Sequence, residues 1–155
     1  MRVWLIASIL LAGATPALAD ERMPPITSQA VSKECGACHM AFQPQFLPQR
    51  SWQRIMDTLP DHFGEDASLP DTTRQEITAY LLAHAADAGN SRAQRRYATG
   101  SGSGEPPLRI TETRRWISEH RGEVRESAWS SPRVGSKANC QACHRGAAAG
   151  YFEDD

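Results

Sequence analysis

The chain has 155 residues, with 17 Lys or Arg against 18 Asp or Glu, so its formal net charge is −1. This near-neutral balance gives no general attraction to nucleic acid. No stretch after the first twenty residues is apolar for the roughly 20 residues that a membrane-spanning helix requires. The length suffices for one ordinary domain or for two very small ones.

Residues 1–19 have the pattern of a secretory signal peptide. Arg2 gives a positive start, an apolar run follows, and Ala17-Leu18-Ala19 forms a small-residue cleavage site. The apolar run is too short to span a bilayer, so an uncleaved anchor is the weaker alternative. We expect cleavage after Ala19 and an exported protein that, once processed, is not an integral membrane protein.

Three amphipathic helices are predicted in the first part of the chain. The first begins at Thr27 or Ser28 and continues into a cysteine motif; the second runs from Ser51 to Pro60; the third begins at Asp71 or at a Thr73/Glu76 capping box and ends at Gly89. The second helix carries an apolar stripe of Trp52, Ile55, Met56 and Leu59. No useful stretch alternates with the period of a strand, so the expected fold class is all-α.

The composition changes after this helical region. Residues 91–107 contain few apolar side chains and a Gly/Ser run, which predicts a linker. A helix with Trp116, Ile117 and His120 on one face follows, with Gly122 as its expected stop, and a last helix is expected to carry a second cysteine motif. The predicted organisation is a signal peptide, a first lobe, a linker and a second lobe, at residues 1–19, 20–90, 91–107 and 108–155.

The four cysteines form two C-x-x-C-H motifs, "CGACH" and "CQACH". This is the attachment signature of c-type haem, because two thioether bonds hold the porphyrin edge while the adjacent imidazole approaches the iron. The candidate residues are Cys35, Cys38, His39, Cys140, Cys143 and His144. Exported cysteines also form disulfides, paired C-x-x-C motifs bind zinc, and single ones serve in thioredoxin-type redox sites. The duplicated motif with its immediate histidine favours two covalently attached haems, and with the leader it indicates a bacterial periplasm.

The second lobe is too small to fold easily by itself. It has fewer than about 50 residues, and such mini-domains usually need a covalent or metal staple. An attached haem supplies both a staple and a core. We expect Trp116 and Trp129 to pack around it.

Each haem iron also needs a second axial ligand, usually Met or His in electron carriers. In the second lobe the remaining candidate is His120, which shares a predicted helix face with Trp116. In the first lobe His62, in a loop bounded by proline and glycine, is the first choice. His84 is the second choice and Met56, which is expected in the core, is the third.

The motifs lie in segments that are together more specific than C-x-x-C-H alone: "ACHMAFQPQFLPQRSW", "HFGEDASL", "RITETRRW" and "NCQACHRGA". In these segments the sequence resembles the bacterial dihaem cytochrome c family over essentially the whole chain after the leader. The resemblance implies a first domain similar to class I cytochrome c, a smaller second haem domain of unusual shape, and two low-spin haems with bis-histidine ligation. It implies His62 and His120 as distal ligands and gives His84 no role, so His84 remains an alternative.

The hypothesis from the sequence is a periplasmic electron-transfer protein rather than an enzyme. Its partners are expected to be another cytochrome and an upstream electron donor, and the known partner of the family it resembles is a small oxygen-binding monohaem cytochrome c. The main alternative is a haem enzyme or gas-binding protein with one open axial position, similar to a peroxidase or an O2 or NO carrier. A second alternative is an exported module that uses zinc or disulfides instead of haem.

Charge is distributed unevenly along the chain. Residues 20–90 hold ten acids and five bases, whereas residues 91–155 hold eleven bases and eight acids. Glu65 and Asp66 lie in an acidic loop that is expected to meet a basic partner. The arginines of the second lobe form a solvated helix face or, alternatively, a basic patch; they are Arg114, Arg115, Arg121 and Arg125.

Overall fold

The computed structural model of the chain describes residues 22–98 and 104–152, so the predicted signal peptide lies outside the described residues. The described part consists of short helices and turns without a β-strand, which confirms the all-α fold class. Its α-helices are α1 (Gln29–Glu34), α2 (Gln49–Asp57), α3 (Asp71–His84), α4 (Arg92–Ala98), α5 (Arg114–His120) and α6 (Glu126–Trp129). Its 3-10 helices are η1 (Pro44–Phe46), η2 (Leu59–Asp61), η3 (Ile110–Glu112), η4 (Cys140–Ala142) and η5 (Ala147–Ala149). None of the helices in these two ranges has the length and apolar character to cross a bilayer.

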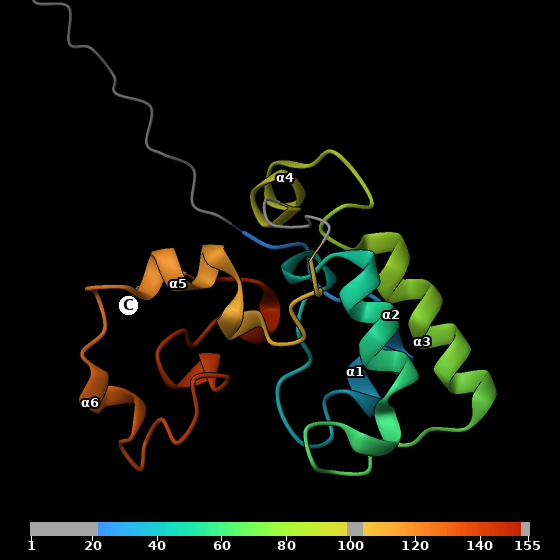
Figure 1. Cartoon of the computed structure of the whole chain (residues 1–155), viewed down its shortest axis with the longest axis horizontal. Coiled ribbons are helices and arrows are strands. Elements are labelled where there is room, and N and C mark those ends of the chain that lie inside the picture. Colours follow the sequence, from blue (N-terminus) through green and yellow to red (C-terminus); the bar gives the residue numbers. More distant parts are fainter. Residues whose placement is uncertain (1–21, 99–103, 153–155) are drawn as a thin grey trace, which may run out of the picture.

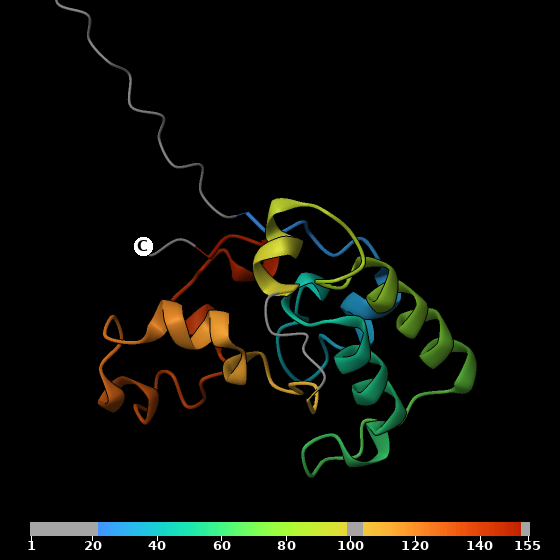
Figure 2. The ribbon, with the colours of Figure 1, turned by 45° about the horizontal axis from the view of Figure 1, so that its top comes forward.

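Helices α2 and α3 lie side by side and form the core of the first lobe (Figures 1 and 2). The core residues from these helices and from η2 are Trp52, Ile55, Met56, Leu59, Ile77 and Leu81. All four members of the predicted apolar stripe are therefore buried. Burying each such side chain contributes about 1.5–3 kcal/mol, so this stripe stabilises the contact between the two helices.

Two predicted helix ends are wrong, the first because of a local turn and the second because of a contact distant in sequence. Helix α1 begins after Ser28, whose Oγ accepts a hydrogen bond from the Val31 amide, but it ends at Glu34 and leaves the cysteine motif in turns. A Cβ on Gly36 would lie 2.2 Å from the Ser32 carbonyl oxygen, so the tight turn after α1 requires glycine. Helix α3 ends at His84 rather than Gly89, because the chain diverges there to donate the Ala86 amide to the Leu47 carbonyl (2.9 Å).

Other predicted boundaries differ at the start of a helix. Helix α2 begins two residues before Ser51, with Pro48 in an extended conformation at its N-cap position. The start of α3 has no side-chain cap from Asp71 or the Thr73/Glu76 pair, because Pro70 occupies the cap position.

The segment predicted as a linker contains a helix. Its apolar residues allow α4 to pack on the first lobe: Ala93 is buried with Met23 and Phe46, and the Tyr97 ring meets Phe46 edge-on at 5.1 Å. Figure 1 shows α4 above the junction between the two halves of the molecule. Residues 99–103 lie outside the described residues, and the division into two domains remains a prediction.

The second lobe contains very little buried apolar surface. Between residues 104 and 152 the buried apolar side chains are Val134 and Ala147. Trp116 and Trp129 are half-buried, and the second cysteine motif begins in the 3-10 helix η4 instead of the expected α-helix. The protein part of this lobe therefore lacks a core of ordinary size.

Contacts from both ends of the described chain join the lobes. The Met23 amide donates to the Gly150 carbonyl (2.9 Å), and the buried Gln43 side chain donates from Nε2 to the Ala147 carbonyl (2.9 Å). Gly150 has φ +89°, and a Cβ there would lie 2.2 Å from the Met23 carbonyl oxygen. This junction therefore requires glycine for both its conformation and its close approach.

Candidate functional site

The structure brings His39 and His62 together in the first lobe. His39 follows the first cysteine motif in the turns after α1, and His62 lies at the end of η2. Their ring centroids are 6.2 Å apart and their planes differ by 24°. The two imidazoles come from separate segments and lie nearly parallel.

A tight turn presents His62. The His62 amide donates to the Glu65 carbonyl (2.7 Å), the Glu65 amide donates back (3.3 Å), and the Gly64 amide donates to Asp61 Oδ1 (3.1 Å). Phe63 and Gly64 both have positive φ, +58° and +101°, as in the central residues of a type I′ turn. Positive φ is uncommon for phenylalanine and often marks a functional site.

The surroundings of His62 favour its neutral form. Burial lowers the pKa of His62 below its ordinary value, and His39 and Arg109 lower it further. The Arg109 guanidinium lies 3.9 Å from the Phe63 ring centre, and a hollow of about 330 Å³ opens beside this turn. A neutral imidazole keeps a lone pair for a metal ion.

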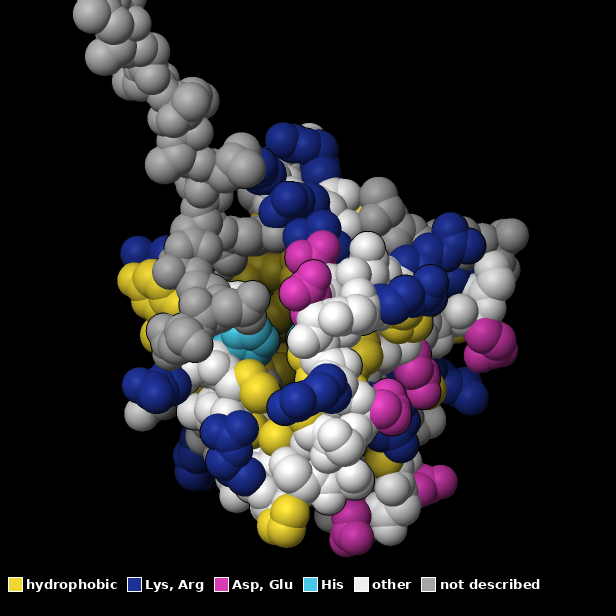
Figure 3. Space-filling model, turned by 90° about the vertical axis from the view of Figure 1, so that its left-hand side faces the viewer, with side chains coloured by type: hydrophobic (Ala, Val, Ile, Leu, Met, Phe, Trp, Pro, Cys, Tyr) yellow, Lys and Arg dark blue, Asp and Glu magenta, His cyan; other side chains and the backbone are white. Residues whose placement is uncertain are grey.

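The second lobe has a matching pair, His120 and His144. Their ring centroids are also 6.2 Å apart, but their planes differ by 88°. Trp116 stacks on His120, with centroids 4.2 Å apart and planes 18° apart, and Trp129 lies 5.4 Å from Trp116. Figure 3 shows histidine in a recess on this side of the molecule, with hydrophobic side chains beside it.

Both pairs have the spacing that a haem iron requires. A metal–imidazole bond of about 2 Å and a ring nitrogen about 1 Å from the ring centre put two opposed ligands about 6 Å apart, centre to centre. His39 Nδ1 lies 2.8 Å from the Met40 carbonyl oxygen, and His120 Nδ1 lies 2.8 Å from that of Trp116. Because a carbonyl can only accept, Nδ1 carries the hydrogen and Nε2 remains available to the metal. The residues present therefore fit an iron porphyrin.

None of the four cysteines forms a disulfide in the described part of the chain. Cys35 and Cys140 are partly covered, whereas Cys38 and Cys143 are exposed. Burial raises the pKa of the Cys140 thiol to about 11 and also raises the pKa of Cys35. Among the described residues, no three His, Cys, Asp or Glu side chains are gathered as a metal-ion site.

The other two candidate ligands of the first lobe lie in different surroundings. His84 is exposed at the end of α3, where its Nδ1 donates to the Tyr80 carbonyl (2.8 Å) and its ring contacts Tyr80. Met56 is 3% exposed within the α2–α3 core, which confirms the expectation that it is a core residue. The geometry favours His62 over both.

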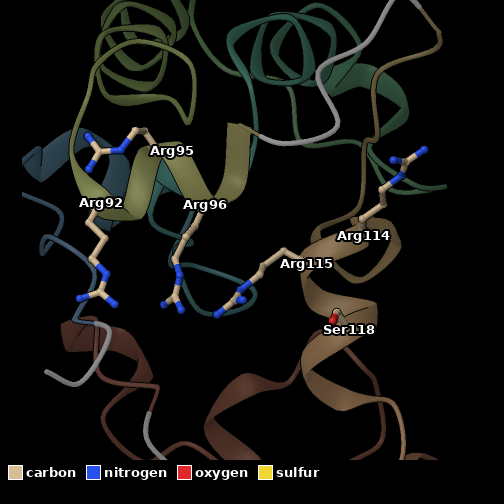
Figure 4. Close-up of a pocket in the computed structure, with 6 residues that line it drawn as sticks. All are labelled: Arg92, Arg95, Arg96, Arg114, Arg115 and Ser118. Carbon is tan, nitrogen blue, oxygen red and sulfur yellow. The ribbon is translucent and has the colours of Figure 1, made fainter. Parts of the chain in front are cut away.

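An arginine-lined hollow was not expected from the sequence. Its volume is about 510 Å³, and its lining residues are Arg92, Arg95, Arg96, Arg114, Arg115 and Ser118. Figure 4 shows the first three projecting from α4, with Arg96 and Arg115 extending toward each other across the gap. The "RAQRR" run was the sequence feature that could have indicated this hollow, but it lies in the predicted linker. It comes to lie opposite α5 only in the folded chain. We refer to these five arginines and Ser118 as the arginine hollow.

Comparison with known proteins identifies the family. A family model for dihaem cytochrome c matches residues 31–152. A diheme cytochrome c structure from Rhodobacter sphaeroides is 40% identical, covers 83% of this chain and 99% of its own, and has a TM-score of 0.76. A structure of DHC purified from Rhodobacter sphaeroides is 41% identical, with the same coverage and a TM-score of 0.64.

A diheme type c cytochrome from Shewanella baltica OS155 is 34% identical, with 81% of this chain and 86% of its own covered and a TM-score of 0.65. A search of curated proteins gave no match. The family match, the two cysteine motifs and the two histidine pairs agree, and the chain therefore belongs to the dihaem cytochrome c family, whose members carry two covalently attached c-type haems and act as electron carriers.

Proposed function

We propose that this protein is a periplasmic electron carrier with bis-histidine ligation at both haems and no catalytic activity. The observation that carries the proposal is the pair of imidazoles in each lobe, with the same ring-centroid separation of 6.2 Å. The proposed axial ligands are His39 with His62 and His120 with His144. The proposed attachment residues are Cys35, Cys38, Cys140 and Cys143.

The residues around the haems explain why transfer is the favoured role. Bound haem supplies a one-electron ferric/ferrous couple. His39 and His120 are each held by a hydrogen bond from Nδ1 to a backbone carbonyl. With an imidazole on each side, the proposed ligands would keep small molecules from the metal and would change little when its charge changes. Histidine in place of methionine also lowers the reduction potential.

Spectroscopy of histidine variants tests the ligand assignment. We expect wild-type ferric protein to be fully low-spin and the reduced protein not to bind carbon monoxide. His62→Ala and His120→Ala each remove one imidazole, so each is expected to turn one haem high-spin and allow carbon monoxide to bind there. His84→Ala removes an exposed histidine from the first lobe and serves as the matched control with an unchanged spectrum.

Three results would contradict the proposal. A high-spin component or rapid carbon monoxide binding in the wild type would support a gas-binding protein or haem enzyme. Loss of a low-spin signal in His84→Ala but not in His62→Ala would transfer the ligand role to His84. A colourless product from cells with a cytochrome c maturation system would support a zinc or disulfide module.

The periplasmic location rests on the leader sequence and on the chemistry of haem attachment. Cleavage after Ala19 would leave Asp20 as the first residue of the exported protein. N-terminal analysis of protein recovered from the periplasmic fraction is expected to begin there. Recovery of the full-length chain from membranes would contradict this part of the proposal.

The partner is proposed to be another cytochrome, such as a small oxygen-binding monohaem cytochrome c, supplied with electrons through an upstream donor. The arginine hollow supports docking of an acidic surface, because its cations come from two helices and only basic residues and a serine line it. Several dispersed guanidinium groups match several carboxylates on a protein better than they match one small anion.

A further inference from the structure

The two histidine pairs have the same centroid separation but different angles between their ring planes. His39 and His62 are within 24° of parallel, whereas His120 and His144 are 88° apart, at the same centroid separation. The two pairs therefore share one centroid separation but differ in the relative orientation of their ring planes. This difference has an electronic consequence if both pairs ligate iron as proposed above.

An imidazole donates π density in one direction only, perpendicular to its ring plane. Two parallel rings act on the same metal dπ orbital and separate it in energy from the other. Two perpendicular rings act on one dπ orbital each and leave the two nearly equal in energy. In ferric low-spin haem, parallel rings give a rhombic electron paramagnetic resonance (EPR) signal, and perpendicular rings give a strongly anisotropic signal dominated by one large g value.

Trp116 makes two contacts with the His120 ring. The indole stacks on the imidazole at 4.2 Å with planes 18° apart, and the Trp116 carbonyl accepts from His120 Nδ1 at 2.8 Å. Trp129 is farther from His120, at 5.8 Å, and is inclined by 51°. The backbone bond alone leaves the ring free to rotate about the donor direction, whereas a stacked indole allows one plane.

We propose that Trp116 is a positioning residue that, by stacking on His120, holds its ring plane perpendicular to that of His144 and so makes the second haem centre electronically distinct from the first. This inference rests on the bis-histidine ligation proposed above. In the described part of the chain, the ring contacts of the near-parallel pair are with phenylalanines rather than an indole: His39 meets Phe42 at 5.1 Å, inclined by 30°, and His62 meets Phe63 at 4.8 Å, inclined by 61°.

EPR spectra of frozen ferric holoprotein test the assignment. We expect two low-spin signals in the wild type, one rhombic and one with a single large g value. Trp116→Met keeps an apolar side chain of flexible shape but removes the flat surface, so the large-g feature is expected to broaden and move to lower g. Trp116→Phe retains a stacking ring and is expected to preserve it, while the rhombic signal of the first haem stays unchanged in every variant.

Trp129→Met is the matched control, because it removes an indole from the same lobe without removing the stack, and it is expected to leave both signals in place.

Two rhombic signals in the wild type would overturn the inference while leaving bis-histidine ligation intact, whereas a high-spin wild type would overturn the ligation itself. Equal shifts in Trp116→Met and Trp129→Met, or no shift in Trp116→Met, would also overturn the role of Trp116. If Trp116→Met does not retain the second haem, Trp116→Leu is measured in its place. Loss of the second haem from both variants would overturn the inference, because it would show that Trp116 maintains the fold of the lobe rather than the ring plane of His120.

Discussion

At the scale of single residues, the turn that presents His62 depends on the conformation of Gly64. Its φ of +101° is strained for any residue with a Cβ, although no heavy atom lies within 4 Å of the position that this Cβ would occupy. We expect Gly64→Ala to destabilise the turn by about 1–3 kcal/mol through the backbone alone. His62 would then leave the iron more often, which would be measured as carbon monoxide binding at the first haem of the reduced protein.

The control for this prediction is Gly104→Ala. Gly104 also has open space around it, but its φ is outside the positive range, so its substitution is expected to leave carbon monoxide binding unchanged. Equal effects of the two substitutions, or no effect of Gly64→Ala, would show that the turn conformation does not control the ligand.

At the scale of helices, the apolar pattern predicted which faces are buried but not where the helices end. The stripe from Trp52 to Leu59 is buried as predicted, because burial depends on local periodicity. The end of α3 and the existence of α4 depend on contacts with Leu47 and Phe46, which are distant in sequence. Long-range contacts of this kind leave no periodic signal.

As with the helices, only part of the candidate site could be predicted from the sequence. Each cysteine motif identifies its own histidine by adjacency, and His120 followed from the shortage of other candidates in its lobe. The preference for His62 over His84 depended on loop chemistry and remains a prediction, which the 6.2 Å separation of the His39 and His62 ring centroids motivates. Ring orientation could not be predicted, because it depends on side-chain stacking.

The second lobe is expected to require its haem for folding. Ordering each residue costs about 1–2 kcal/mol, and the lobe buries few apolar side chains that offset this cost. In Cys140→Ser/Cys143→Ser, we expect residues 108–152 to lose protection from amide hydrogen exchange while α2 and α3, with the first haem still attached, retain theirs. Unchanged protection in the second lobe of a one-haem protein would contradict this expectation.

At the scale of the whole molecule, the arginine hollow and the acidic loop are expected to select different partners. The double variant Arg92→Gln/Arg114→Gln is expected to slow electron transfer to an acidic monohaem cytochrome c several-fold at low ionic strength. The double variant Glu65→Gln/Asp66→Asn is expected to slow electron transfer to a basic cytochrome c by a similar factor. The measurement is the rate of electron transfer to each partner in a stopped-flow instrument. Each double variant serves as the control for the other, because it leaves the other charged surface unchanged. The differences should vanish near 1 M salt, where the Debye length is about 3 Å. Rates that do not depend on ionic strength in any variant would contradict both docking surfaces.

The hydrogen bond between Met23 and Gly150 has a mechanical consequence for the molecule. It attaches the second lobe to the first near the end of the chain, in addition to the covalent connection through α4. A body hinged at one point can swing, whereas a body held at two separate points can turn only about the line between them. Together with the hydrogen bond from Gln43 to Ala147, this contact restrains the relative motion of the two lobes. Electron transfer between the two proposed haem sites is therefore expected to be nearly as fast in viscous solvent as in water.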